Sequence, residues 1–154
     1  MVPIPTPRAG APSVWKGVPV PQCLDDNMNM KDWLRKHPEV RTIRVAAADL
    51  NGQARGKRVP ARFAESVVKN GTRFPFSVLN LDIWGEDIDD SPLVFEQGDQ
   101  DGVLKPTERG FMPMPWLEAP TALLPIWMFR ENGQPYEGDP RHALRHVVER
   151  FKER

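Results

Sequence analysis

The sequence predicts an α+β domain with a mixed sheet and packed helices. Several short segments alternate apolar and polar residues with a period of two, which is typical of strands. Three others repeat their apolar residues at the spacing of a helix face. The predicted order is α-β-β-α-β-β-β-α, in which a hairpin is followed by a helix that returns to further strands.

The bulk composition is that of one globular domain. The chain has 154 residues, of which 40% are hydrophobic and 27% are charged, and 21 basic residues balance 21 acidic ones. A formal charge of zero gives no general drive toward nucleic acid or an anionic membrane. A single cysteine, Cys23, excludes an internal disulfide, and neither a secretory signal nor a membrane-spanning apolar run is visible. We therefore expect a cytoplasmic protein.

Residues 1–26 are rich in proline, with five of the 17 prolines in the first 19 positions. We expect a flexible N-terminal arm there. The first helix is predicted over Met28–His37, where Met30, Trp33 and Leu34 share one face and Pro38 ends the pattern.

A hairpin follows this helix. From Val40 the period changes to two, which predicts a strand, and Asn51-Gly52 is typical of a two-residue hairpin turn. The return strand, Gln53–Val59, is short and basic. Its cationic residues are Arg55, Lys57 and Arg58.

A second helix is predicted from Pro60, because proline suits the first helical turn, to a stop at Asn70-Gly71. Its predicted buried stripe is Phe63, Ala64, Val67 and Val68. The next apolar run, Phe76–Leu81, is predicted to be a strand that ends in the carboxylate of Asp82. The acidic residues 86–98 indicate a surface loop.

The remaining strands are predicted over Val103–Pro106 and Thr121–Phe129, with an extended, non-helical segment at Phe111–Trp116 between them. Pro125 cannot donate a ladder hydrogen bond, which favours an edge position or a bulge. Asn132-Gly133 then predicts another turn.

A last helix should begin at Asp139-Pro140, which have N-cap and N1 chemistry. No stop signal follows, so we expect this helix, residues 139–154, to lead into a further domain. Its apolar stripe is Leu144, Val147, Val148 and Phe151.

Five of these segments, in this order, resemble the N-terminal domain of the glutamine synthetase family, and most of all its γ-glutamylpolyamine synthetase-like branch. They lie between Val40 and Arg154. The matching motifs are Asp49–Gly52 with Arg55–Pro60, Gly98–Gly102, Met114–Trp116 with Pro120–Ala122, Asn132–Pro135, and Gly138–Arg141 with Leu144.

The resemblance implies that residues 27–138 form the β-grasp-like N-terminal domain of a longer ATP-dependent ligase. In such enzymes ATP phosphorylates the side chain of glutamate, and an amine displaces the phosphate. It further implies stacked hexameric rings (a dodecamer), with ATP and Mg²⁺ (or Mn²⁺) bound mainly by a C-terminal catalytic domain. This chain has neither a glycine-rich phosphate loop nor a Glu-x-Glu strand, so we expect it to be inactive alone and to bind no metal.

Asp82 aligns with the aspartate that binds and deprotonates ammonium in this family; the alternative is an aspartate that only caps the turn at Gly85. In glutamine synthetases proper Gly-Ser-Ser follows this aspartate, whereas Ile83, Trp84 and Gly85 follow it here. Trp84 could line a pocket for an alkylated amine through cation–π contact, or it could be buried in a core or an interface. The departure favours an acceptor other than ammonia.

Other candidates carry weaker signals. Arg55 and Lys57 suit a phosphate- or carboxylate-binding site, but a solvated strand face is the alternative. Asp99 and Asp101 flank a turn, and His142 and His146 have a spacing that can bind zinc, yet no third ligand is evident. Two other functions stay open: a non-catalytic β-grasp-like interaction module and, with less support, nucleic-acid binding through residues 55–58.

Overall fold

The computed structural model describes residues 30–153. The predicted arm at 1–26, Cys23 and the first two residues of the predicted N-terminal helix lie outside the described residues. The strands are β1 (Thr42–Ala48), β2 (Ala54–Pro60), β3 (Thr72–Pro75), β4 (Asp101–Pro106), β5 (Met112–Pro113) and β6 (Thr121–Phe129). The helices are α1 (Met30–Lys36), α2 (Ala64–Asn70), α3 (Pro92–Phe95) and α4 (Pro140–Lys152), with 3₁₀ helices η1 (Ala61–Phe63) and η2 (Phe76–Asn80).

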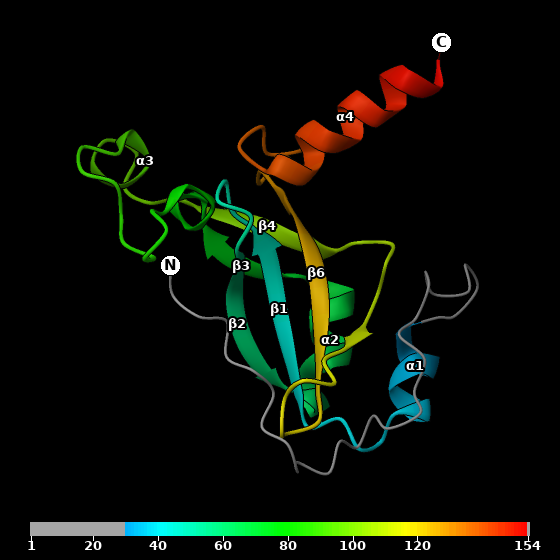
Figure 1. Ribbon diagram of the computed structural model, residues 1–154. Helices are drawn as coiled ribbons and strands as arrows, with labels where there is room; N and C mark the ends of the chain where they lie inside the picture. Colours follow the sequence, from blue (N-terminus) through cyan, green and yellow to red (C-terminus); the bar gives the residue numbers. More distant parts are fainter. Residues whose placement is uncertain (1–29, 154) are drawn as a thin grey trace.

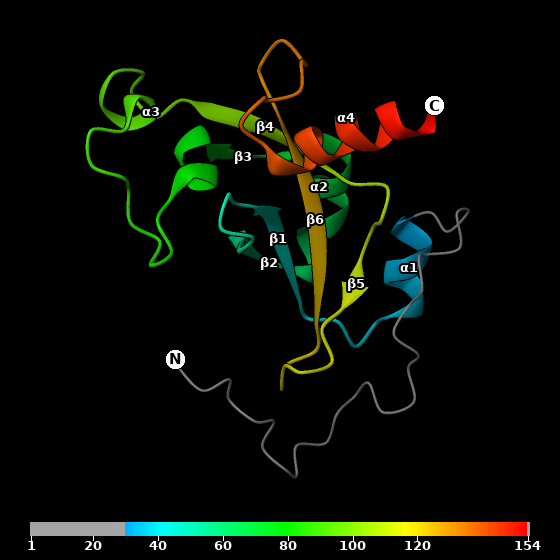
Figure 2. The same cartoon turned by 45° about the horizontal axis from the view of Figure 1, so that its top comes forward.

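The six strands form one mixed sheet in the order β2-β1-β6-β4-β3 (Figure 1), and β5 also pairs with β6 (Figure 2). The central strand β6 runs parallel to β1 and antiparallel to β4 and β5. The predicted α+β class with a mixed sheet is therefore confirmed. The edge position expected from Pro125 is wrong: this residue lies in the central strand, where pairing with β1 ends and pairing with β4 begins.

The core lies between the sheet and the helices α1 and α2. Trp33 on α1 packs against Phe111 beside β5, with ring centroids 5.3 Å apart, and Figure 2 shows α1 at that side of the sheet. Ala64 and Val67 of α2 belong to the same core, as do Phe76 and Leu79 of η2. The predicted stripe was wrong at Phe63, which is half exposed because it precedes α2 and lies under the guanidinium of Arg62.

Two predicted elements near the candidate site differ in the structure. The segment Phe76–Leu81 is not a strand: β3 ends at Pro75, and η2 follows. Its buried apolar side chains, Phe76 and Leu79, are three residues apart, which matches the turn of a 3₁₀ helix and not the alternation of a strand, and Ser77 between them is buried too. The β1–β2 connection is also longer than a two-residue turn, because five residues separate Ala48 from Ala54.

Helix α4 begins as predicted. The side chain of Asp139 accepts a hydrogen bond from the N–H of Arg141, and Pro140 occupies the first turn. The helix projects from the end of the sheet at which β6 ends (Figure 1). Its apolar stripe of Leu144, Val147, Val148 and Phe151 is exposed.

Candidate functional site

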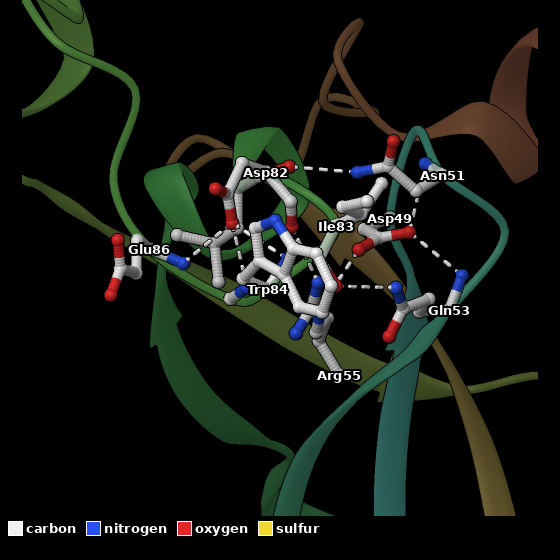
Figure 3. A network of polar contacts seen from close by, with 10 residues as sticks. Asp49, Asn51, Gln53, Arg55, Asp82, Ile83, Trp84 and Glu86 are labelled. Atoms are coloured by element: carbon white, nitrogen blue, oxygen red, sulfur yellow. Dashed lines mark hydrogen bonds and ion pairs between the residues drawn. The ribbon is translucent and has the colours of Figure 1, made fainter. Parts of the chain in front are cut away.

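The candidate site is the loop Leu81–Glu86, which follows η2. Asp82 Oδ1 accepts hydrogen bonds from the backbone N–H groups of Trp84, Gly85 and Glu86, at 2.8, 2.8 and 2.9 Å (Figure 3). Gly85 has a φ of 93°, a conformation that glycine adopts without strain. Asp82 therefore caps its own turn, as the alternative to an amine-binding role predicts.

This capping uses only one oxygen of the carboxylate. Among the described residues, Asp82 Oδ2 has no hydrogen-bond partner. The N–H of Glu86, with smaller contributions from Trp84, Gly85 and the Arg55 charge, lowers the pKa of Asp82 despite some desolvation. The group is thus a charged carboxylate at neutral pH with one oxygen available to a cation, and it is a weaker base than an ordinary aspartate.

A second carboxylate, Asp49, lies at the end of β1 and is only 1% exposed. Its Oδ1 accepts from the N–H groups of Asn51 and Gln53 at 2.9 and 2.7 Å, and its Oδ2 accepts from Arg55 Nε at 2.7 Å. Burial raises the pKa of Asp49, but the Arg55 guanidinium and the two N–H groups lower it by more. Asp49 is therefore a buried, charged group whose partners fix the conformation of the hairpin loop.

Three side chains of this hairpin reach the candidate loop (Figure 3). Arg55 Nη2 donates to the carbonyl of Asp82 at 2.7 Å. Asn51 Nδ2 and Gln53 Nε2 donate to the carbonyls of Leu81 and Ile83, at 2.8 and 2.9 Å. The predicted candidates Asp82 and Arg55 are thus brought together.

Sequence reasoning did not single out Asp49, Asn51 or Gln53 as site residues. A signal for Asp49 was present, because a carboxylate directly after a buried strand needs partners for its charge. Nothing in the sequence indicated that Asn51 and Gln53 would bind a loop 30 residues away.

The two side chains that follow Asp82 point away from the core. Ile83 is 57% and Trp84 79% exposed. One alternative for Trp84 was burial in the core of this domain. Its exposure shows that this alternative is wrong. Gly85 packs over Arg55 so closely that a Cβ there would lie 2.7 Å from Arg55 Nη1.

Lys57 lies elsewhere. Its Nζ donates to the carbonyl of Arg73 at 3.0 Å and lies 4.8 Å from the ring centroid of Phe74, both on β3. Because β2 and β3 are the two ends of the sheet order, this contact shows that the sheet curls back on itself. The structure does not bring Lys57 to Asp82.

The weak metal candidates are dispersed. His142 Nε2 lies 2.9 Å from the carbonyl oxygen of Met128, and its ring stacks on Trp127. Within residues 30–153, no three His, Cys, Asp or Glu side chains are placed to hold a metal ion. In the same range no helix is long and apolar enough to cross a membrane.

Comparison with known proteins finds similar sequences among glutamate–amine ligases and glutamine synthetases. The chain is 29% identical over 125 residues to γ-glutamylputrescine synthetase of Escherichia coli, which covers 81% of the chain and 26% of that protein. It is 27% identical over 128 residues to glutamate–isopropylamine ligase of a Pseudomonas species, with 82% and 28% covered. Glutamine synthetase of Methanococcus voltae is 29% identical over 116 residues, with 74% and 25% covered.

A solved structure described as a GmaS/ADP complex superimposes with a TM-score of 0.61 at 26% identity, over 81% of this chain and 26% of that one. No protein-family model matches the chain. The predicted resemblance to the glutamine synthetase family is confirmed over about 80% of the chain. The chain spans about a quarter of the length of the curated relatives that it matches.

Proposed function

We propose that residues 27–138 form a β-grasp-like N-terminal domain of an ATP-dependent glutamate–amine ligase, and that Asp82 binds the acceptor amine. The observation that carries this proposal is the divided role of the Asp82 carboxylate. Oδ1 is committed to the turn, whereas Oδ2 is left to attract a cationic amine. The capping and amine-binding interpretations are therefore compatible.

The lowered pKa refines the role of Asp82 in this proposal. A weak base is a poor proton acceptor but a dependable anion at neutral pH. Asp82 then acts mainly by holding the ammonium group close. Because an ammonium nitrogen has no lone pair, one proton must leave before the amine attacks, and the Asp82 carboxylate is the adjacent acceptor for it. A second proton leaves the nitrogen after the attack.

The acceptor in this proposal is an amine other than ammonia. Ile83 and Trp84 expose apolar surface directly beside Asp82, where an alkyl chain attached to the ammonium group would lie. An indole face also attracts cations. The names of two relatives, which specify putrescine and isopropylamine, agree with this choice.

The rest of the reaction belongs to a segment that this chain does not span. The proposal places ATP and Mg²⁺ (or Mn²⁺) on a C-terminal catalytic domain, as the family resemblance implies. Residues 139–154 would lead into that domain, and the exposed stripe of α4 would be covered there. Asp82 would serve the active site of a neighbouring subunit in a ring-shaped homo-oligomer.

The test is an amine screen on the protein at the length that its natural gene encodes. Phosphate release with ATP and glutamate is measured with ammonia, putrescine, ethanolamine and longer polyamines. We expect an alkylated amine to be preferred over ammonia. Asp82→Asn keeps an oxygen for the turn but loses the charge, and should lower kcat/KM for the amine about 100-fold.

Asp89→Asn is the matched control, because Asp89 is exposed in the neighbouring acidic loop. Ammonia as the best acceptor would contradict the choice of substrate, and full activity of Asp82→Asn would contradict the role of Asp82.

A non-catalytic interaction module is the second candidate, favoured by the exposed stripe on α4. A natural gene that ends at Arg154, together with no ATP-dependent phosphate release, would decide for it.

A further inference from the structure

Six backbone groups of the candidate loop make the hydrogen bonds that hold it, three to side chains of the hairpin and three to the side chain of Asp82. Each of the three carbonyls from Leu81 to Ile83 accepts one hydrogen bond from a hairpin side chain. Each of the next three N–H groups, from Trp84 to Glu86, donates to Asp82 Oδ1. Backbone groups are the same in every residue other than proline, so none of these bonds depends on the side chains at positions 83 and 84.

Arg55 is the centre of this arrangement. Its Nε binds the buried Asp49, and its Nη2 binds the Asp82 carbonyl, while Gly85 lies against Nη1. The planar guanidinium fixes the angle between these contacts, which the single ammonium group of a lysine cannot reproduce. Because the other oxygen of Asp49 is bound by two backbone N–H groups, the position of the guanidinium is itself fixed.

We infer that Asn51, Gln53 and Arg55 are positioning residues that hold the Asp82 carboxylate in place, whereas Ile83 and Trp84 are exchangeable specificity positions. This inference rests on the proposed amine-binding function. The ligand class is a primary ammonium carrying an alkyl chain, with the charge at Asp82 Oδ2 and the chain against Ile83 and Trp84. Exchanging the side chains at 83 and 84 would then change the preferred amine without displacing the carboxylate.

Arg55→Lys and Trp84→Ser separate the two roles, and Arg58→Gln is the control, since Arg58 is exposed on the same strand. Arg55→Lys keeps a cation beside the buried Asp49, so the fold should survive. Two measurements are made on each variant at full natural length. The first is amide hydrogen exchange at Trp84, Gly85 and Glu86, and the second is the steady-state kinetics with ammonium, with putrescine and with ATP.

In Arg55→Lys we expect amide exchange in the loop to rise roughly tenfold, the effect of one lost hydrogen bond. KM should rise by a similar factor for both amines and stay unchanged for ATP. In Trp84→Ser we expect unchanged exchange, while the preference for putrescine over ammonium falls roughly tenfold with the loss of cation–π and apolar contact. Arg58→Gln should change neither quantity.

Unchanged loop exchange in Arg55→Lys would overturn the positioning role. Increased exchange in Trp84→Ser, or a changed amine preference in Arg55→Lys, would overturn the separation of the two roles. If the wild-type protein releases no phosphate with any amine, the proposed function fails and the specificity role fails with it. The exchange data still decide in that case whether the hairpin holds the loop.

Discussion

The loop Leu81–Glu86 and the helix α4 both expose large apolar side chains, but they are anchored in different ways. The loop is bound along its whole backbone by the hairpin and by Asp82. Helix α4 is attached near its start, through Asp139, His142 and Arg145, and its later turns project from the sheet. A fixed backbone presents exposed side chains in one geometry, as recognition requires, whereas an amphipathic stripe on a projecting helix is typical of a packing surface.

The largest effect is expected at the anchor of α4. Asp139 is completely buried, caps the helix, and accepts a hydrogen bond from the N–H of Met128 at 2.8 Å. Asp139→Ala removes the cap and leaves that N–H unsatisfied, so the free energy of unfolding should fall by about 3 kcal/mol. Urea denaturation of the chain measures the loss. The exposed Glu118 offers the control Glu118→Ala, and an equal loss in both variants would contradict the anchoring role.

The anchor of the loop should be nearly as sensitive. Arg55→Ala leaves the buried Asp49 carboxylate with its two N–H partners but without a cation. Breaking a buried ion pair is costly, although the remaining hydrogen bonds moderate the effect, and we expect a loss of about 2 kcal/mol in urea denaturation. Arg55→Lys should lose less than half of that. Equal losses in the two variants would show that the guanidinium geometry, and not the charge, supports the fold.

Acid should weaken the loop through its two carboxylates. The pKa values of Asp49 and Asp82 are lowered in the folded state, so the stability that they contribute is present above the unfolded-state pKa and is lost as the pH falls through the folded-state pKa. The protection of the loop amides against hydrogen exchange and the free energy of unfolding should therefore both decrease below about pH 5. Asp82→Asn should flatten this pH dependence. An identical curve for this variant, measured by urea denaturation between pH 7 and pH 2, would contradict the assignment.

Helix α4 is capped by its own neighbours, whereas the loop is held by residues distant in the sequence, and this difference explains what could be predicted from the sequence. Local chemistry was sufficient for α4, because Asp139 and Pro140 act on neighbouring N–H groups, and for β6, whose apolar run coincides with the strand. The edge position, one of the two alternatives predicted for Pro125, was wrong because β6 changes its pairing partner at this residue in the middle of the sheet, which no local pattern records.

The candidate site was predicted only in part. Asp82 was identified through the family resemblance, yet its fixed geometry depends on Asn51, Gln53 and Arg55. These residues are separated from it in the sequence by α2, β3 and two 3₁₀ helices. The segment Phe76–Leu81 was assigned to a strand, but its short run of apolar and small residues suits a 3₁₀ helix equally well. Only the tertiary burial of Phe76 and Leu79 selects the 3₁₀ helix.

The smallest effect on stability is expected from the exposed apolar side chains themselves. Phe151 is 73% and Trp84 79% exposed, so Phe151→Ser and Trp84→Ser should each change the unfolding free energy of the chain by less than about 0.5 kcal/mol. The two variants should then be equally stable, so any difference between them reports what the loop and α4 bind. In the protein at natural length, Trp84→Ser should alter the amine preference, and Phe151→Ser should leave it unchanged. Phe151→Ser should instead make the α4 segment easier to proteolyse, because the proposed C-terminal domain would pack less well on the apolar stripe of α4. An altered amine preference in Phe151→Ser would show that α4 also contributes to the amine site.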